Sequence, residues 1–138
     1  MPEELDHDQT ALDPVSDDWL LRAIERVEEA GQLAAAALTR SLENVSEVRR
    51  QREDGVPVDS IIARVLVTGG PEARRATEDA FHRYQHAVMV LRALMIRKLV
   101  DHSGSSLSDV ARKMNISRQK VTQLYRIGRS LSETPEEE

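Results

Sequence analysis

The chain has 138 residues, no cysteine and a net charge of −5. A chain of this length forms one domain or two small ones, and without cysteine it has no disulfide, thiolate metal site or cysteine nucleophile. Aromatic residues make up only 3% of it, so the core must be aliphatic, which favours an all-α fold over a β-sandwich. No apolar run reaches the length of a membrane span, and the acidic N-terminus is unlike a secretory signal. We therefore expect a cytoplasmic protein, and the arginine bias is typical of a GC-rich bacterial genome.

The net charge conceals an uneven distribution along the chain. Residues 1–85 carry 18 acidic and 10 basic side chains, whereas residues 86–130 carry two acidic and nine basic ones. Residues 131–138 add four acidic side chains and no basic one. A localised basic segment is the electrostatic feature expected of a nucleic-acid-binding region. Residues 86–130 are therefore the candidate functional region.

The N-terminal half is predicted to be a helical region that follows a tail. Residues 1–15 have no apolar period and predict a disordered acidic tail. A helix is expected from residue 16 or 17 to about residue 54, where Gly55 and Pro57 end it. Its apolar residues are spaced alternately by four and three, which indicates a heptad seam with weak points at Gly31 and Ser41. The strong members of this seam are Leu20, Ile24, Val27, Leu38, Val45 and Val48. The seam predicts that residues 16–86 mediate homodimerisation, as in a coiled coil, or contact with another protein.

Two more helices are expected before the basic segment. Residues 58–67 form a short apolar helix, with Asp59 or Ser60 as the cap; a strand is the less favoured alternative. Gly69 and Gly70 break the chain, and Pro71 suits the first position of a long helix that runs to about His102. That helix would extend from the N-terminal half into the basic segment.

Residues 105–129 read SSLSDVARKMNISRQKVTQLYRIGR and predict two short helices joined by a tight turn. Ser106 and Asp109 form a variant of the capping box, so a helix begins at Leu107. Asn115 tolerates the left-handed conformation that the turn requires, and Ser117 caps the second helix. The apolar positions then face inward, with Ala111 as the small residue where the two helices cross and Val121 facing it.

The polar side chains left outside are the types that hydrogen-bond base edges and phosphates. No acidic residue interrupts this face between Asp109 and Glu133. We expect Arg118 and Gln119 to read bases. The whole predicted DNA-binding set is Ser117, Arg118, Gln119, Lys120, Thr122, Gln123, Arg126, Arg112, Lys113 and Arg129. Of these, Arg112, Lys113, Lys120 and Arg129 are expected to bind mainly phosphate.

The stretch LSDVARKMNISRQKVTQL resembles the helix-turn-helix of bacterial transcriptional regulators, most closely that of sigma factor region 4, and is also similar to phage-repressor-type domains. The resemblance covers about residues 88–129 and implies a tri-helical DNA-binding domain over residues 87–130, without a wing. It implies that Arg118 and Gln119 begin the recognition helix, that Thr122, Gln123 and Arg126 follow on its groove-facing side, and that Ser117 and residues 105–108 contact backbone phosphate. Asn115 departs from the usual glycine. Residues 131–138 are predicted to be a second disordered acidic tail. Four scattered aromatic residues do not suit promoter melting, which argues against a sigma factor.

These features predict a sequence-specific transcriptional regulator that binds double-stranded DNA as a dimer at a palindromic site. It would lie on the nucleoid when bound. The alternative is a helical adaptor that docks on RNA polymerase or another regulator through its N-terminal half and binds DNA weakly or not at all. An enzyme is not expected, because no nucleophile–base pattern or phosphate-binding loop occurs. Glu78, His82 and His86 have the spacing of metal ligands on a helix, but a solvated polar stripe is favoured, so no metal or other cofactor is expected.

Overall fold

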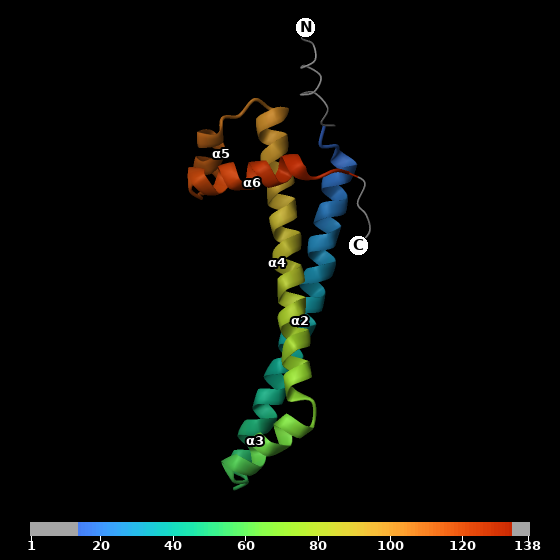
Figure 1. Ribbon diagram of the computed structural model, residues 1–138, viewed down its shortest axis with the longest axis vertical. Helices are drawn as coiled ribbons and strands as arrows, with labels where there is room; N and C mark the ends of the chain where they lie inside the picture. Colours follow the sequence, from blue (N-terminus) through green and yellow to red (C-terminus); the bar gives the residue numbers. More distant parts are fainter. Residues whose placement is uncertain (1–13, 134–138) are drawn as a thin grey trace. The chain divides into compact units, whose positions relative to one another are not determined.

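The computed structural model describes residues 14–133, and every regular element in this range is an α-helix (Figure 1). The helices are α2 (Asp17–Glu53), α3 (Val58–Val67), α4 (Gly70–Asp101), α5 (Leu107–Met114) and α6 (Arg118–Ser130). The all-α class is confirmed, and the predicted helix ends agree within one or two residues. No helix in residues 14–133 is both long and apolar enough to cross a membrane. Most of the two predicted acidic tails, residues 1–13 and 134–138, lies outside the described residues.

The breaks between α2, α3 and α4 depend on glycine and proline. Gly55 has a φ of 92° and Gly69 a φ of 90°, a conformation that other residues rarely adopt. A side chain at Gly70 would place its Cβ 2.7 Å from the backbone oxygen of Val65, so the chain can turn this tightly only at glycine. The expected side-chain cap of α3 is wrong. Pro57 is the N-cap and no side chain caps the helix, because α3 begins at Val58 and already includes Asp59 and Ser60.

The described chain divides into two compact units, which we call unit 1 and unit 2. Unit 1 consists of residues 14–25 together with residues 87–133, and unit 2 consists of residues 26–86. Helices α2 and α4 each contribute to both units. The first turns of α2 therefore belong to the same unit as the basic C-terminal segment, whereas the sequence had assigned them to the N-terminal region.

The start of α2 joins unit 1 through a small apolar cluster. Val15, Trp19 and Ala23 are buried there against Leu94 of α4. Leu20, Val90, Leu91 and Leu131 pack around this cluster. Val15 is 1% exposed, so it lies inside the fold and not in the tail that the sequence predicted, and Leu131 likewise packs on the cluster.

Unit 2 is a hairpin in which α2 and α4 approach each other through small residues. The ring of Tyr84 lies so close to Gly31 that a Cβ there would be 3.3 Å from a ring carbon. Ala34 and Ala37 of α2 are buried, and α3 contributes the buried Ile61. Gly31 and Ser41, which interrupt the predicted heptad seam, are half-buried. One of these weak points, Gly31, lies where α2 meets α4.

Candidate nucleic-acid interface

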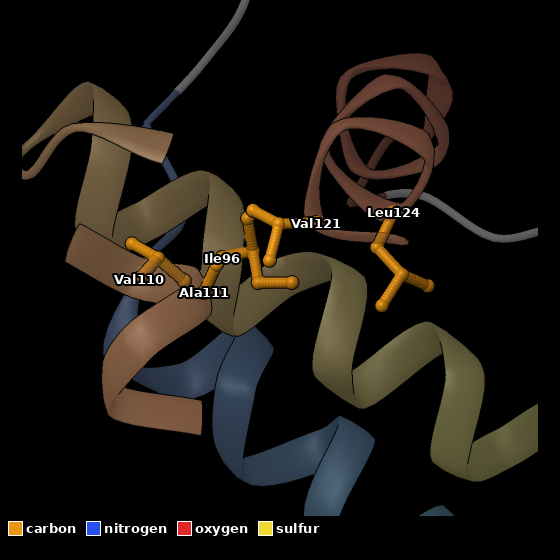
Figure 2. Close-up of a cluster of buried hydrophobic side chains, with 5 residues drawn as sticks. All are labelled: Ile96, Val110, Ala111, Val121 and Leu124. Carbon is orange, nitrogen blue, oxygen red and sulfur yellow. The ribbon is translucent and has the colours of Figure 1, made fainter. Parts of the chain in front are cut away.

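The end of α4 packs against α5 and α6 around one apolar cluster (Figure 2). Its buried members are Ile96, Val110, Ala111, Val121 and Leu124. This arrangement agrees with the predicted inward faces of the two short helices, with alanine as the small residue on α5. The cluster determines which sides of α5 and α6 remain open to solvent.

The sequence did not predict the close approach of α4 and α6 at Gly128. A Cβ on Gly128 would lie 2.5 Å from the backbone oxygen of Ala93, so glycine alone lets the two helices touch at this point. Gly128 and Ala93 are both small and buried. They lie far apart in the chain, so the sequence does not show that they face each other.

Local hydrogen bonds fix the turn between α5 and α6. The backbone N–H of Asp109 donates to Ser106 Oγ over 3.0 Å, and that of Lys120 donates to Ser117 Oγ over 3.0 Å. Asn115 has φ 58° and ψ 46°, which is the predicted left-handed conformation, and its N–H donates to carbonyl oxygens of the last turn of α5. The two predicted caps and the turn residue are confirmed. Because Ser117 Oγ accepts a hydrogen bond from a backbone N–H in the first turn of α6, which has no partner within the helix, α6 has a defined start.

The outward face of α6 carries the central residues of the predicted DNA-binding set. Successive residues of an α-helix turn by about 100°, so Gln119, Gln123 and Arg126 form a stripe on the side opposite the buried Val121. These three side chains are exposed, and Thr122 beside them is half-buried. The other predicted contacts on α5 and α6 are also exposed. They are Ser117, Arg118, Lys120, Arg112, Lys113 and Arg129.

Asp109 is the one acidic residue of α5 and α6. Arg112 Nη2 lies 3.0 Å from Asp109 Oδ1, and this hydrogen bond and charge hold the pKa of Asp109 below its ordinary value. The carboxylate is therefore charged at neutral pH and largely compensated by its partner. Arg112 then offers less free positive charge to a phosphate than the neighbouring Lys113 does.

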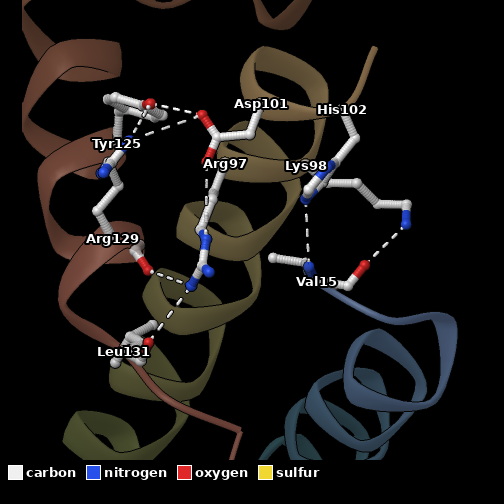
Figure 3. Close-up of polar contacts among 9 residues, drawn as sticks. Val15, Arg97, Lys98, Asp101, His102, Tyr125, Arg129 and Leu131 are labelled. Carbon is white, nitrogen blue, oxygen red and sulfur yellow. Dashed lines mark hydrogen bonds and ion pairs between the residues drawn. The ribbon is translucent and has the colours of Figure 1, made fainter. Parts of the chain in front are cut away.

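Arg129 is held by a network that the sequence did not predict (Figure 3). Tyr125 Oη donates to Asp101 Oδ1 over 2.6 Å and accepts from Arg129 Nη1 over 3.0 Å. The hydrogen bond to Tyr125 raises the pKa of Arg129 above its ordinary value, and the guanidinium carbon lies 5.7 Å from the ring centre of Tyr125. The i,i+4 spacing of Tyr125 and Arg129 is the sequence signal that could have predicted the hydrogen bond between them.

Arg97 of α4 is the most deeply buried charged residue in the described chain, at 1% exposure. Its Nη1 donates to the backbone oxygen of Gly128 over 3.1 Å and to that of Leu131 over 3.3 Å (Figure 3). Its guanidinium carbon lies 5.3 Å from the ring centre of Trp19, and its Nε lies 3.8 Å from Asp101 Oδ2. Arg97 therefore joins the C-terminal end of α6 to the start of α2.

The segment before α2 is attached to the end of α4 through its backbone. The N–H of Val15 donates to His102 Nε2 over 3.3 Å, and Lys98 Nζ donates to the carbonyl oxygen of Val15 over 2.8 Å (Figure 3). At the other end of the chain, Arg22 and Glu133 form an ion pair of 2.7 Å. Val15 near one end of the described chain is thus attached to the end of α4, and Glu133 at the other end is attached to α2.

The seam residues of the N-terminal half are divided between the two units. Leu20 and Ile24 lie in unit 1, where Leu20 packs on the Trp19 cluster. The other four lie in unit 2. Val27 is half-buried there, and Leu38, Val45 and Val48 are exposed.

Glu78, His82 and His86 are exposed on α4, and no group of three His, Asp or Glu side chains placed to hold a metal ion occurs within residues 14–133.

No family model matches the chain, and neither a curated protein nor a solved structure matches it.

Proposed function

We propose that this protein is a sequence-specific transcriptional regulator that binds double-stranded DNA as a dimer through α5 and α6. The observation that carries the proposal is the outward face of α6, a capped helix on which Gln119, Gln123 and Arg126 lie in line and no acidic residue occurs. A single α-helix fits the major groove of B-DNA, and Gln and Arg are the side chains that pair with adenine and guanine edges there.

In this proposal α6 is the recognition helix, and α5 lies across the backbone, as in the helix-turn-helix that the sequence resembles. Arg118 and Gln119 are in the first turn of α6, where side chains reach base edges. Lys113 and Lys120 are exposed on either side of the turn and would contact phosphates. Bound to DNA, the protein would be associated with the nucleoid.

Replacing Gln119 by alanine is expected to weaken binding to the preferred site by about 1–3 kcal/mol at one base pair, because one bidentate base contact is lost. The preferred site is first selected from a random duplex library, and affinities are then measured by fluorescence anisotropy. Gln32→Ala, which removes an exposed glutamine of α2 in unit 2, is the matched control. The placement of the recognition helix is wrong if both Gln119→Ala and Arg118→Ala leave affinity and specificity unchanged.

Replacing Lys120 by alanine is expected to weaken binding to all sequences alike. Each phosphate contact releases about one counterion, so the plot of log affinity against log salt should become shallower by about one unit. The same titration is run on the selected duplex and on an unrelated duplex. A loss confined to the selected duplex would show that Lys120 reads a base instead.

The alternative function is an adaptor that docks on RNA polymerase or another regulator. The apolar side chains exposed on α3, among them Ile62 and Leu66, favour some protein contact by unit 2. A mobility-shift assay on genomic fragments at several salt concentrations separates the two functions, because the adaptor would show no fragment preference and little binding at physiological salt.

A further inference from the structure

Unit 2 has almost no apolar core of its own. Within residues 26–86, Ile61 is the one large apolar side chain that is buried, and the other buried apolar residues are Ala34 and Ala37. Twelve large apolar side chains of this unit are exposed by a third or more. A helical unit of this size has to bury apolar area to offset the entropy of ordering its chain. Unit 2 therefore needs a surface from outside to cover it.

The exposed apolar side chains include those around an open groove between α2 and α4, inside unit 2. The groove has a volume of about 350 Å³. Gly31, Ala34 and Ala35 of α2 contribute its small residues, and Leu38, Phe81 and Tyr84 contribute its large ones. We call this surface the groove face. Leu42 and Val45 follow Leu38 by four and seven positions, so they extend the same side of α2, and both are exposed.

We propose that the groove face binds the groove face of a second copy of this chain. This deepens the proposed function by naming the surface of the proposed dimer. A two-fold interface brings the same surface together from both copies, so the surface must be complementary to itself. The groove face meets this condition because it holds both a hollow over glycine and alanine and projecting side chains beside it. Leu38 of one copy would enter the hollow of the other, in the manner of knobs into holes.

The size of the groove face agrees with a dimer. The groove face with its extension runs from Gly31 to Val45 along α2, which is about 20 Å of helix, so a hairpin two helix diameters wide presents on the order of 400 Å² in projection there. A standard protein interface takes about 800 Å² of accessible surface from each partner. The large apolar side chains exposed on the groove face and its extension are Leu38, Leu42, Val45, Phe81 and Tyr84. Together they amount to on the order of 500 Å², which is about the non-polar share of one partner's surface in a standard interface.

The first test measures mass in solution without DNA. The wild-type chain should have twice its monomer mass of 15.5 kDa by light scattering at micromolar concentration. Leu38→Glu should shift the protein towards the monomer, with at least a tenfold rise in the dissociation constant. Leu33→Glu is the matched control, since Leu33 is 55% exposed against 46% for Leu38 and lies about 140° away around the same helix. A monomeric wild-type chain, or equal effects of the two variants, would overturn the proposal.

A second test does not depend on whether Leu38→Glu folds. Because the chain has no cysteine, a single introduced cysteine can be cross-linked only to another copy. Ala35→Cys, in the groove face, should give a dimer with a short bis-maleimide, whereas Ala36→Cys, which is the neighbouring exposed alanine outside the groove, should give much less. Equal cross-linking of the two variants contradicts the proposed face.

The two proposals fail in different ways. A dimer that dissociates on Leu38→Glu but binds no DNA supports the groove-face interface and contradicts the proposed function. A monomer that binds a selected duplex contradicts the groove-face interface and the dimer, and supports the sequence-specific DNA binding of the proposed function. A monomer whose groove face is covered by a different protein, or by a small molecule, also overturns the second-copy interface.

Discussion

Replacing Trp19 by alanine should destabilise unit 1 by about 3–5 kcal/mol, although Trp19 lies far from α5 and α6 in the sequence. Trp19 is 6% exposed and packs with Val15, Ala23 and Leu94, so the truncation leaves a cavity in the cluster. It also removes the aromatic face over the Arg97 guanidinium. The free energy of unfolding is measured by urea denaturation followed by circular dichroism. DNA affinity at low temperature should change much less than stability, because no predicted DNA contact is removed.

Leu21→Ala is the control for this experiment. Leu21 lies two positions along α2 from Trp19 and is 52% exposed, so its truncation should cost little. The wild-type protein offers a second probe, since Trp19 is its one tryptophan and its fluorescence should change in the same transition. If Trp19→Ala unfolds at the urea concentration of the wild-type protein, the start of α2 is not part of the folded unit.

Replacing Arg97 by alanine is expected to have a comparable effect, a loss of about 3–5 kcal/mol, because it breaks a buried charged network. The carbonyl oxygens of Gly128 and Leu131 lose a donor, and Asp101 loses one of its cationic neighbours. The end of α6 should then be less firmly held. Amide hydrogen exchange should show faster exchange in α6, which a purely global measurement would not resolve.

Two further substitutions separate the volume of Arg97 from its hydrogen bonds. Arg97→Met keeps most of the packing but donates no hydrogen bond, so its stability should lie between those of the wild type and Arg97→Ala. Arg97→Lys should rescue only in part, since an ammonium group does not stack on Trp19 as a planar guanidinium does. Wild-type stability in Arg97→Ala would show that the network does not hold α6.

If both predictions hold, the candidate DNA-binding surface depends on buried residues that lie outside it. Trp19 and Arg97 lie behind α6, and through Gly128 and Leu131 they anchor its C-terminal end. Gln119 and its neighbours near the N-terminal end are fixed by the Ser117 cap and the apolar cluster. Substitutions of Trp19 or Arg97 should therefore lower stability with DNA specificity unchanged. Substitutions of Gln119 should alter DNA specificity with stability unchanged.

The sequence by itself determined the helices and their ends. The caps at Ser106 and Ser117 and the left-handed Asn115 satisfy hydrogen bonds within a few residues, so neighbouring residue types suffice to predict them. The exposed polar stripe of α6 was equally predictable, because helical periodicity separates Gln119 and Gln123 from the inward Val121.

Only the tertiary structure decided which distant residues meet. The pairing of Trp19 with Arg97, the approach of Gly128 to Ala93, and the division of the seam that places Leu20 in unit 1 and Leu38 in unit 2 join or separate residues far apart in the chain. Periodicity shows that a side chain faces inward but does not name its partner. In unit 2, Ala34 and Ala37 of α2 are buried, whereas Leu38 and Val45 of the predicted seam are exposed, because periodicity fixes which side chains share a face and not which neighbour covers that face.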